Sequence, residues 1–249
     1  MGRHRHDECV PFDLSPLVPE ARRPAGEAAA VYLRQTRPWL AALVVHGSAL
    51  KGGFIPGCSD IDFQLWLREG AWNEGVLRLP PALAIQRDLA AVDVGPFQYI
   101  QGHARRAGRD IGPIPGTYHV LSGALPVPEA TLEVVLDRCR SVLTHRHDYL
   151  ASDLLDHGGG RLERTTRFVC TDVWPVLFSR LCLLENDLAV WRLTKAEMIA
   201  RLPEPLRAEA DRFHALVWAH YTGERTPDTA LAVIAQGAEV IAAARRDVQ

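Results

Sequence analysis

The chain has 249 residues, of which 47% are hydrophobic and 23% charged, as expected for a globular protein of one large or two small domains. Its formal net charge of −2 gives no basic surface for general nucleic-acid binding, so we expect no nucleic-acid partner. We also expect a cytoplasmic protein without a membrane partner, because we find neither a long apolar run nor a signal-peptide pattern.

The first part of the chain predicts an N-terminal extension and a helix. Residues 1–25 are rich in proline, and we expect them to form an extension outside the folded domain. Residues 26–37 contain strong helix formers and an apolar stripe, which predict a helix packed on the first strand.

Residues 43–67 carry the chemistry around which we expect the chain to be organised. They predict a strand, a Gly47-Ser48 turn, a connection with several glycines, and a second strand with Asp60 and Asp62. On a strand these two acids point to the same face, about 6–7 Å apart. Two carboxylates at that separation can bind one Mg²⁺ ion, which takes only a few protein oxygens. Gly47-Ser48, placed before a helix, offers backbone N–H groups to phosphate oxygens.

These two motifs together resemble the signature of polymerase-β-type nucleotidyltransferases. Gly47-Ser48 is followed, after a gap of roughly ten residues, by Ser59-Asp60-Ile61-Asp62. With Ala49 after the serine and Gly52-Gly53 in the gap, the pattern is similar to that of the streptomycin- and spectinomycin-type aminoglycoside O-adenylyltransferases. Either motif alone would fit two surface aspartates beside an ordinary turn.

The resemblance implies an enzyme that uses Mg²⁺ and transfers AMP from ATP to a hydroxyl of an aminoglycoside-type antibiotic, with release of pyrophosphate. Asp60 and Asp62 would bind the metal and act in catalysis. Gly47, Ser48 and Ser59 would bind the nucleotide. The acceptor would be a small, hydroxylated, cationic antibiotic, and the protein a monomer or homodimer.

The family usually places a third carboxylate, a glutamate, on a later strand, where it takes the proton from the acceptor hydroxyl. After a predicted helix at 82–90, Asp93 has apolar neighbours on both sides, as that glutamate does, and we predict it as the third catalytic acid. The alternative for Asp93 is a turn acid before Gly95-Pro96. Gln98 competes for the position within a clearer strand pattern at 97–101, but an amide cannot take a proton.

The rest of the chain predicts a loop and then helices only. Glycine and proline at 102–128 predict an ordered loop path. From residue 130 on we find no strand pattern, and we expect one long helix at 164–186 with a kink at Pro175. Thr194 and Thr226 are predicted N-caps. The predicted fold is α/β of the α+β type, with a nucleotidyltransferase domain at 26–127, which holds a small mixed sheet, and an all-α domain at 128–249.

The predicted helical domain also resembles the family. The sequences Phe178-Ser179-Arg180 and Leu193-Thr194-Lys195 are similar to the family's pattern of an Arg and a Lys that contact the ATP phosphates. The resemblance therefore makes Arg180 and Lys195 nucleotide-binding residues. Lys51 and Lys195 are the only lysines in the chain. Four acids of this domain could contact a cationic acceptor: Glu163, Asp172, Glu185 and Asp187. We predict Asp172 and Glu185 as the acceptor contacts.

Two other functions remain open from the sequence. One is a nucleotidyltransferase that modifies a protein or RNA hydroxyl, as in toxin–antitoxin systems. The other is a nucleotide- or antibiotic-binding protein on the same fold whose chemistry is impaired, which the uncertain third carboxylate would explain. The five cysteines are scattered without metal-ligand spacing, so we expect reduced thiols.

Overall fold

The computed structural model describes residues 12–145, 149–158 and 160–246. The chain divides into two compact units, which are described separately below. The sheet unit contains residues up to 50 together with 60–112 and 118–128. The helical unit contains residues 51–59, 113–117 and those from 129 on. The predicted α+β fold class is confirmed, with a mixed sheet and its helices followed by a helical region.

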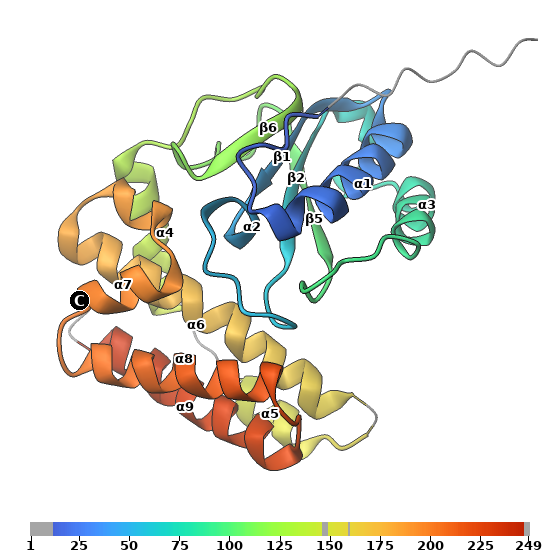
Figure 1. Cartoon of the computed structure of the whole chain (residues 1–249). Coiled ribbons are helices and arrows are strands. Elements are labelled where there is room, and N and C mark those ends of the chain that lie inside the picture. Colours follow the sequence, from blue (N-terminus) through green and yellow to red (C-terminus); the bar gives the residue numbers. More distant parts are fainter. Residues whose placement is uncertain (1–11, 146–148, 159, 247–249) are drawn as a thin grey trace, which may run out of the picture. The chain divides into compact units, whose positions relative to one another are not determined.

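The sheet unit is built on four strands in the order β5-β2-β1-β6 (Figure 1): β1 (Leu40–His46), β2 (Ile61–Leu67), β5 (Ile100–Arg106) and β6 (Tyr118–Gly123). β1 is antiparallel to β2 and to β6, whereas β2 is parallel to β5. The four consecutive residues 42–45 of β1 are all buried. A central strand covered on both faces needs such an unbroken apolar run, and the sequence supplies it.

The two faces of the sheet differ. One face is covered by α1 (Pro19–Thr36) and α3 (Leu79–Leu89), and the Tyr32 ring lies 5.2 Å from the Phe63 ring. On the other face, Trp66 and Val44 pack with residues of β6. The register pairs Ala42 with Trp66 at the apolar end of this face, and His46 with Asp62 at the end where β1 stops. The second face therefore changes from apolar to polar along β1.

The first helix begins earlier than predicted. α1 starts at Pro19, not at residue 26, so part of the predicted extension belongs to the folded unit. Pro19 lies at the start of the helix, where a missing backbone N–H is tolerated. Ala21, Pro24 and Ala25 are buried and continue the apolar stripe of the helix toward its N-terminus. Residues 1–11 of the predicted extension lie outside the described residues.

The predicted loop at 102–128 is wrong, because this stretch contains most of β5 and all of β6. β6 pairs with β1 from Tyr118 beside His46 to Gly123 beside Ala42. The strand's hydrogen-bond partners come from a segment far away in the chain, which local glycine and proline content does not reveal. At Gly123 (φ +76°) an added Cβ would lie 2.1 Å from the Ala41 carbonyl oxygen, so a side chain does not fit there.

Between β2 and β5 the chain forms a small hairpin and a shifted helix. β3 (Trp72–Asn73) and β4 (Val76–Leu77) are joined by Glu74 and Gly75, both with positive φ, as a two-residue hairpin turn requires. α3 begins at Leu79, three residues before the predicted start. β5 begins at Ile100, so the strand predicted at 97–101 is displaced toward the C-terminus.

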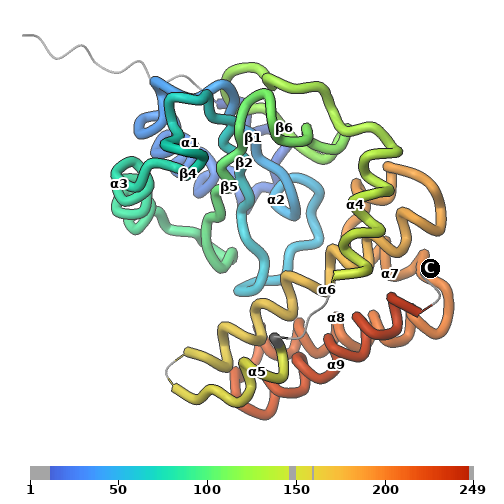
Figure 2. Tube along the Cα trace, turned by 180° about the vertical axis from the view of Figure 1, so that it is seen from behind, coloured from blue at the N-terminus to red at the C-terminus, as the bar shows by residue number. Residues whose placement is uncertain are grey.

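The helical unit contains α4 (Leu132–Thr144), α5 (Tyr149–Leu155), α6 (Arg161–Glu185), α7 (Lys195–Arg201), α8 (Leu206–Thr222) and α9 (Pro227–Arg245). α6 packs against α4 and α9, and α8 lies along α9 (Figure 2). The predicted long helix is confirmed with a start three residues earlier. Thr194 and Thr226 are confirmed as N-caps, each with a capping box. Among the described residues from 130 on, no strand occurs.

Within the described ranges, no helix is long and apolar enough to cross a membrane. The four described cysteines, which have free thiols, are Cys58, Cys139, Cys170 and Cys182.

The close crossing of α9 with α6 and α8 yields a stability prediction. An Ala in place of a helical Gly normally stabilises by about 1 kcal/mol. At Gly237, however, an added Cβ would lie 2.2 Å from Val169 Cγ1 and 3.1 Å from a Phe213 ring carbon. Gly237→Ala should therefore lower the free energy of unfolding by about 1–3 kcal/mol in urea titrations.

The matched control is Gly26→Ala in α1. There the added Cβ meets only the Leu14 Cδ1 atom, at 2.9 Å, and the tip of a leucine side chain can move aside. A Gly237→Ala protein at least as stable as the wild type would contradict the described helix packing.

Candidate functional site

The predicted Gly-Ser turn and the second aspartate meet at the end of β1. Gly47 follows β1 directly, with a φ of +75°. A Cβ added at Gly47 would lie 2.6 Å from Asp62 Oδ2, so the Asp62 carboxylate packs against the bare Cα of Gly47. Glycine is therefore required here for both its backbone conformation and its lack of a side chain. The structure thus brings these two predicted site residues together within the sheet unit.

Ser48, the second residue of the predicted turn, is buried and begins α2 (Ser48–Lys51). The Leu50 N–H donates to the Gly47 carbonyl oxygen at 3.2 Å and closes the turn. α2 has only four residues, so its macrodipole adds little to anion binding. What this turn can offer a phosphate is backbone N–H groups.

Asp60 lies immediately before β2 and two residues from Asp62. Its side chain is half-buried, and the following residue, Ile61, donates its N–H to the Tyr99 carbonyl oxygen at 3.1 Å. Within the described residues, no group of three or more His, Cys, Asp or Glu side chains could hold a metal ion. A pair of aspartates still suits Mg²⁺, which takes one or two protein carboxylates and completes its shell with water and phosphate oxygens.

Ser59 has a structural role in its own unit. Its buried Oγ accepts a hydrogen bond from the Ile55 N–H at 2.8 Å, and its own N–H donates to the Ile55 carbonyl oxygen at 2.9 Å. These bonds close the loop that leads into Asp60. The predicted contact of Ser59 with a nucleotide stays a prediction.

The expected strand position of Asp93 is wrong. Asp93 lies in the loop after α3, where its side chain is 69% exposed and forms an ion pair with Arg23 of α1. Its Oδ1 accepts the Gly95 N–H, which forms an Asx turn before Pro96. The Gly95 N–H, and then the Arg23 guanidinium, lower the pKa of Asp93. The alternative of a turn acid describes its surroundings correctly.

The residues beside Asp62 in the sheet are different ones. The register pairs Asp62 with Gln101 of β5 and with His46 of β1. His103, two residues further along β5, therefore shares the face of Asp62, and its ring lies 6.2 Å from the His46 ring. Gln98, the competing candidate, lies in the turn before β5. Neither Gln101 nor His103 supplies a third carboxylate.

Gln101, His46 and His103 were not predicted as neighbours of Asp62. A signal was present, because Gln101, His103 and Arg105 alternate with apolar or small residues, as on a strand with one polar face. The glycine and proline residues further along the chain led us to predict a loop there instead of a strand. Burial, and then the charge of Arg105, lower the pKa of His103.

In the helical unit, the two predicted phosphate ligands lie on different helices. Arg180 is half-buried on α6, two residues after Phe178. Lys195 is the first residue of α7, and its Nζ lies 5.5 Å from the centre of the Trp174 ring. Both side chains belong to the same compact unit.

The acids proposed for acceptor binding differ in their surroundings. Asp172 is half-buried on α6. Glu185, at the end of α6, accepts hydrogen bonds from Nε and Nη2 of Arg201 in a bidentate ion pair. A cationic acceptor at Glu185 would have to compete with that guanidinium. The predicted acceptor contacts of Asp172 and Glu185 both stay predictions. Of the other two acids, Glu163 lies 3.7 Å from Arg225 and Asp187 accepts the Ala189 N–H.

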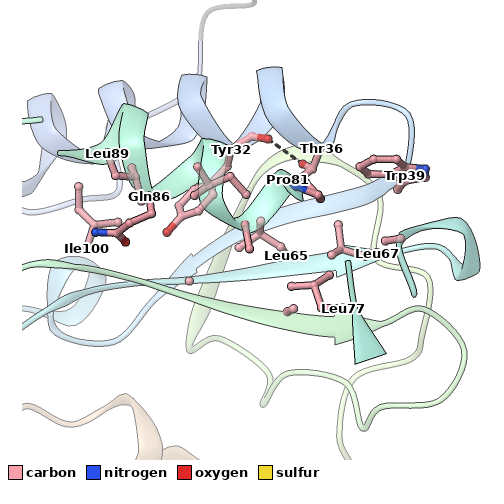
Figure 3. A pocket seen from close by; sticks show the side chains of 15 residues that line it. Tyr32, Thr36, Trp39, Leu65, Leu67, Leu77, Pro81, Gln86, Leu89 and Ile100 are labelled. Atoms are coloured by element: carbon pink, nitrogen blue, oxygen red, sulfur yellow. Dashed lines mark hydrogen bonds between the residues drawn. The ribbon is translucent and has the colours of Figure 1, made fainter. Parts of the chain in front are cut away.

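A cavity of about 190 Å³ lies on the other face of the sheet, under α1 and α3 (Figure 3). Leu65, Leu67 and Ile100 point into it, and in the strands they alternate with the polar residues of the Asp62 face. Its lining is mainly apolar and includes no carboxylate. It is therefore separate from the predicted chemistry.

No protein-family model matches the chain, and no curated protein is significantly similar to it. The chemistry of the site is therefore inferred from its residues and their geometry.

The surroundings of His103 predict a pH dependence. Because the pKa of His103 is below its usual 6.5, the folded protein binds fewer protons than the unfolded chain as the pH falls through that value. The free energy of unfolding should therefore decrease from pH 7 toward pH 5, and His103→Gln should make this decrease smaller. NMR titration of the imidazole checks the cause directly, and a pKa of 6.5 or above would contradict it.

Proposed function

We propose that this protein is a Mg²⁺-dependent nucleotidyltransferase that transfers AMP from ATP to a hydroxyl of a small cationic acceptor of the aminoglycoside type. The observation that carries the proposal is the contact between the Asp62 carboxylate and the bare Cα of Gly47. Two motifs that are separate in the sequence thereby occupy one place in the sheet unit. The class of acceptor rests on the resemblance to aminoglycoside adenylyltransferases.

The residues fit a magnesium ion in their chemistry. Asp60 and Asp62 provide two carboxylates at the start of β2, and the space over Gly47 that a Cβ would fill is occupied by an oxygen of Asp62. These two aspartates would hold the ion. Mg²⁺, when bound, supplies positive charge that neutralises phosphate oxygens.

The protein's own contribution would be positioning and charge, which dominate catalysis of phosphoryl-type transfer. The backbone at Gly47 and Ser48 would contact phosphate oxygens, and Arg180 and Lys195 of the helical unit are further candidates for that role. The acceptor hydroxyl attacks the α-phosphorus, the bond to pyrophosphate breaks, and AMP remains on the acceptor oxygen. The hydroxyl proton needs an acceptor, and His103, whose lowered pKa favours the neutral imidazole, can take it.

A second candidate is a nucleotide-binding protein on the same fold without transfer activity. It is favoured by Gln101 and His103 on the strand beside Asp62, where the adenylyltransferase pattern calls for an acid. It is also favoured by the exposed ion pair of Asp93 with Arg23. This candidate predicts that ATP binds but that no acceptor is modified.

The test is pyrophosphate release from ATP and Mg²⁺ with a panel of aminoglycosides that includes streptomycin and spectinomycin. Asp60→Asn and Asp62→Asn should each lower the rate about 100-fold or more, because each removes charge that holds the metal. The matched control Asp93→Asn should keep its activity, since that side chain pairs with Arg23 at the surface.

Loss of activity in Asp93→Asn alone would contradict the assignment of the site. ATP binding without pyrophosphate release for any acceptor would support the second candidate instead. Label from ATP that appears on protein or RNA would point to a macromolecular acceptor.

A further inference from the structure

The only two lysines of the chain are far apart in the sequence, but both belong to the helical unit, and, after burial, the charge of Lys195 lowers the pKa of Lys51. Lys51 ends α2, and Lys195 begins α7. The sequence resemblance points to Lys195 and gives no role to Lys51. Lys51 therefore has no role in the proposed function.

The Lys51 ammonium contacts one aromatic ring and one backbone carbonyl. Its Nζ lies 4.1 Å from the centre of the Phe178 ring and donates a hydrogen bond to the Trp191 carbonyl oxygen at 3.3 Å. The Phe178 and Trp191 rings are stacked, with centroids 5.6 Å apart. An ammonium has three N–H donors, so this arrangement leaves donors for a ligand.

The backbone brings Lys51 to Lys195. Gly52 and Gly53 both have positive φ and reverse the chain after α2. A Cβ added at Gly53 would lie 2.9 Å from Thr194 Cβ and 3.7 Å from the Lys195 backbone nitrogen. The segment after Lys51 therefore packs directly on the start of α7, whose first residue is Lys195.

The charges around Lys51 favour an anion. Burial, and then the positive charge of Lys195, lower the pKa of Lys51 to about 8, while Glu197 acts in the opposite direction. The Glu197 carboxylate already accepts hydrogen bonds from Nα and Oγ1 of Thr194 in the capping box. His214 is close enough to Lys195 that, after burial, the charge of Lys195 lowers its pKa. A bound anion would offset both the burial of the Lys51 ammonium and its repulsion by Lys195.

We propose that Lys51 and Lys195 together form the binding site for the oligophosphate chain of the nucleotide, next to the stacked rings of Phe178 and Trp191. The identity of the ligand as a nucleotide rests on the proposed function, whereas binding of an oligophosphate does not depend on transfer. Lysine is a compact cationic partner for phosphate oxygens, and two lysines suit a chain with several negative charges.

The experiment measures binding of tripolyphosphate, ATP and AMP by calorimetry to the full chain. Lys51→Met keeps an unbranched, apolar side chain that is one atom shorter and removes the ammonium that lies over Phe178. It should weaken tripolyphosphate and ATP about tenfold or more, and leave AMP nearly unchanged. Lys195→Met should do the same.

The matched control is Arg212→Met, which removes a positive charge from the exposed Arg212–Glu209 pair of α8 in the same unit. Its affinity should stay within about twofold of the wild type, because exposed charge pairs contribute little. Wild-type affinity of Lys51→Met for tripolyphosphate and ATP would overturn the proposal.

A second measurement uses the wild-type protein and does not depend on whether a variant folds. Reductive ¹³C-methylation labels the side-chain amines of only two residues, Lys51 and Lys195, beside the N-terminal amine. Tripolyphosphate should shift both lysine signals and raise the pKa of Lys51, and its affinity should fall as the pH rises through about 8. A Lys51 signal that does not respond at saturation would overturn the proposal.

The two proposals can fail independently. Tripolyphosphate binding that needs Lys51, without transfer to any acceptor, would support the lysine site and reject the transferase. Normal transfer activity and ATP affinity in Lys51→Met would support the transferase and reject the lysine site.

Discussion

The contact between the Asp62 carboxylate and the Cα of Gly47 is the constraint on which the account of this site depends. It exists because β1 and β2 are antiparallel with His46 opposite Asp62, and because the chain turns at Gly47 with a positive φ. The apolar end of the same face, around Trp66, anchors that register. A shift of the register by one residue would turn Asp62 to the face covered by α1. The packed end of the sheet thus positions the polar end.

The glycine-rich segment after α2 has a corresponding role in the helical unit. Gly53 fits against Thr194 only without a side chain, and this fit places Lys51 beside Lys195. The glycines of residues 47–53 therefore serve close packing as well as turning. At Gly47 the neighbour is a carboxylate, and at Gly53 it is the N-cap of α7. Residues 47–53 thus pack against the Asp62 carboxylate in one unit and contribute Lys51 to the other.

The sequence was informative where the determining interactions are local. The spacing of Gly47 and Asp62, and the N-caps Thr194 and Thr226, follow from motifs that span from a few residues to sixteen. The sequence did not predict features whose structure depends on residues far away in the chain. β6 needs the hydrogen bonds of β1, and the apolar neighbours of Asp93 belong to a turn that Arg23 helps to hold. The pairing of Lys51 with Lys195 depends on tertiary packing that no local pattern contains.

Paramagnetic NMR with Mn²⁺ in place of Mg²⁺ and a non-hydrolysable ATP analogue tests directly whether Asp62 holds the metal. Asp62 shares its face of the sheet with His46 and His103, so a metal held by Asp62 must lie close to both imidazoles. We expect the metal–nucleotide complex to broaden the signals of both histidines in the wild type, and we expect Asp62→Asn to abolish this effect. Unbroadened signals in the wild type, or equal broadening in Asp62→Asn, would contradict the account.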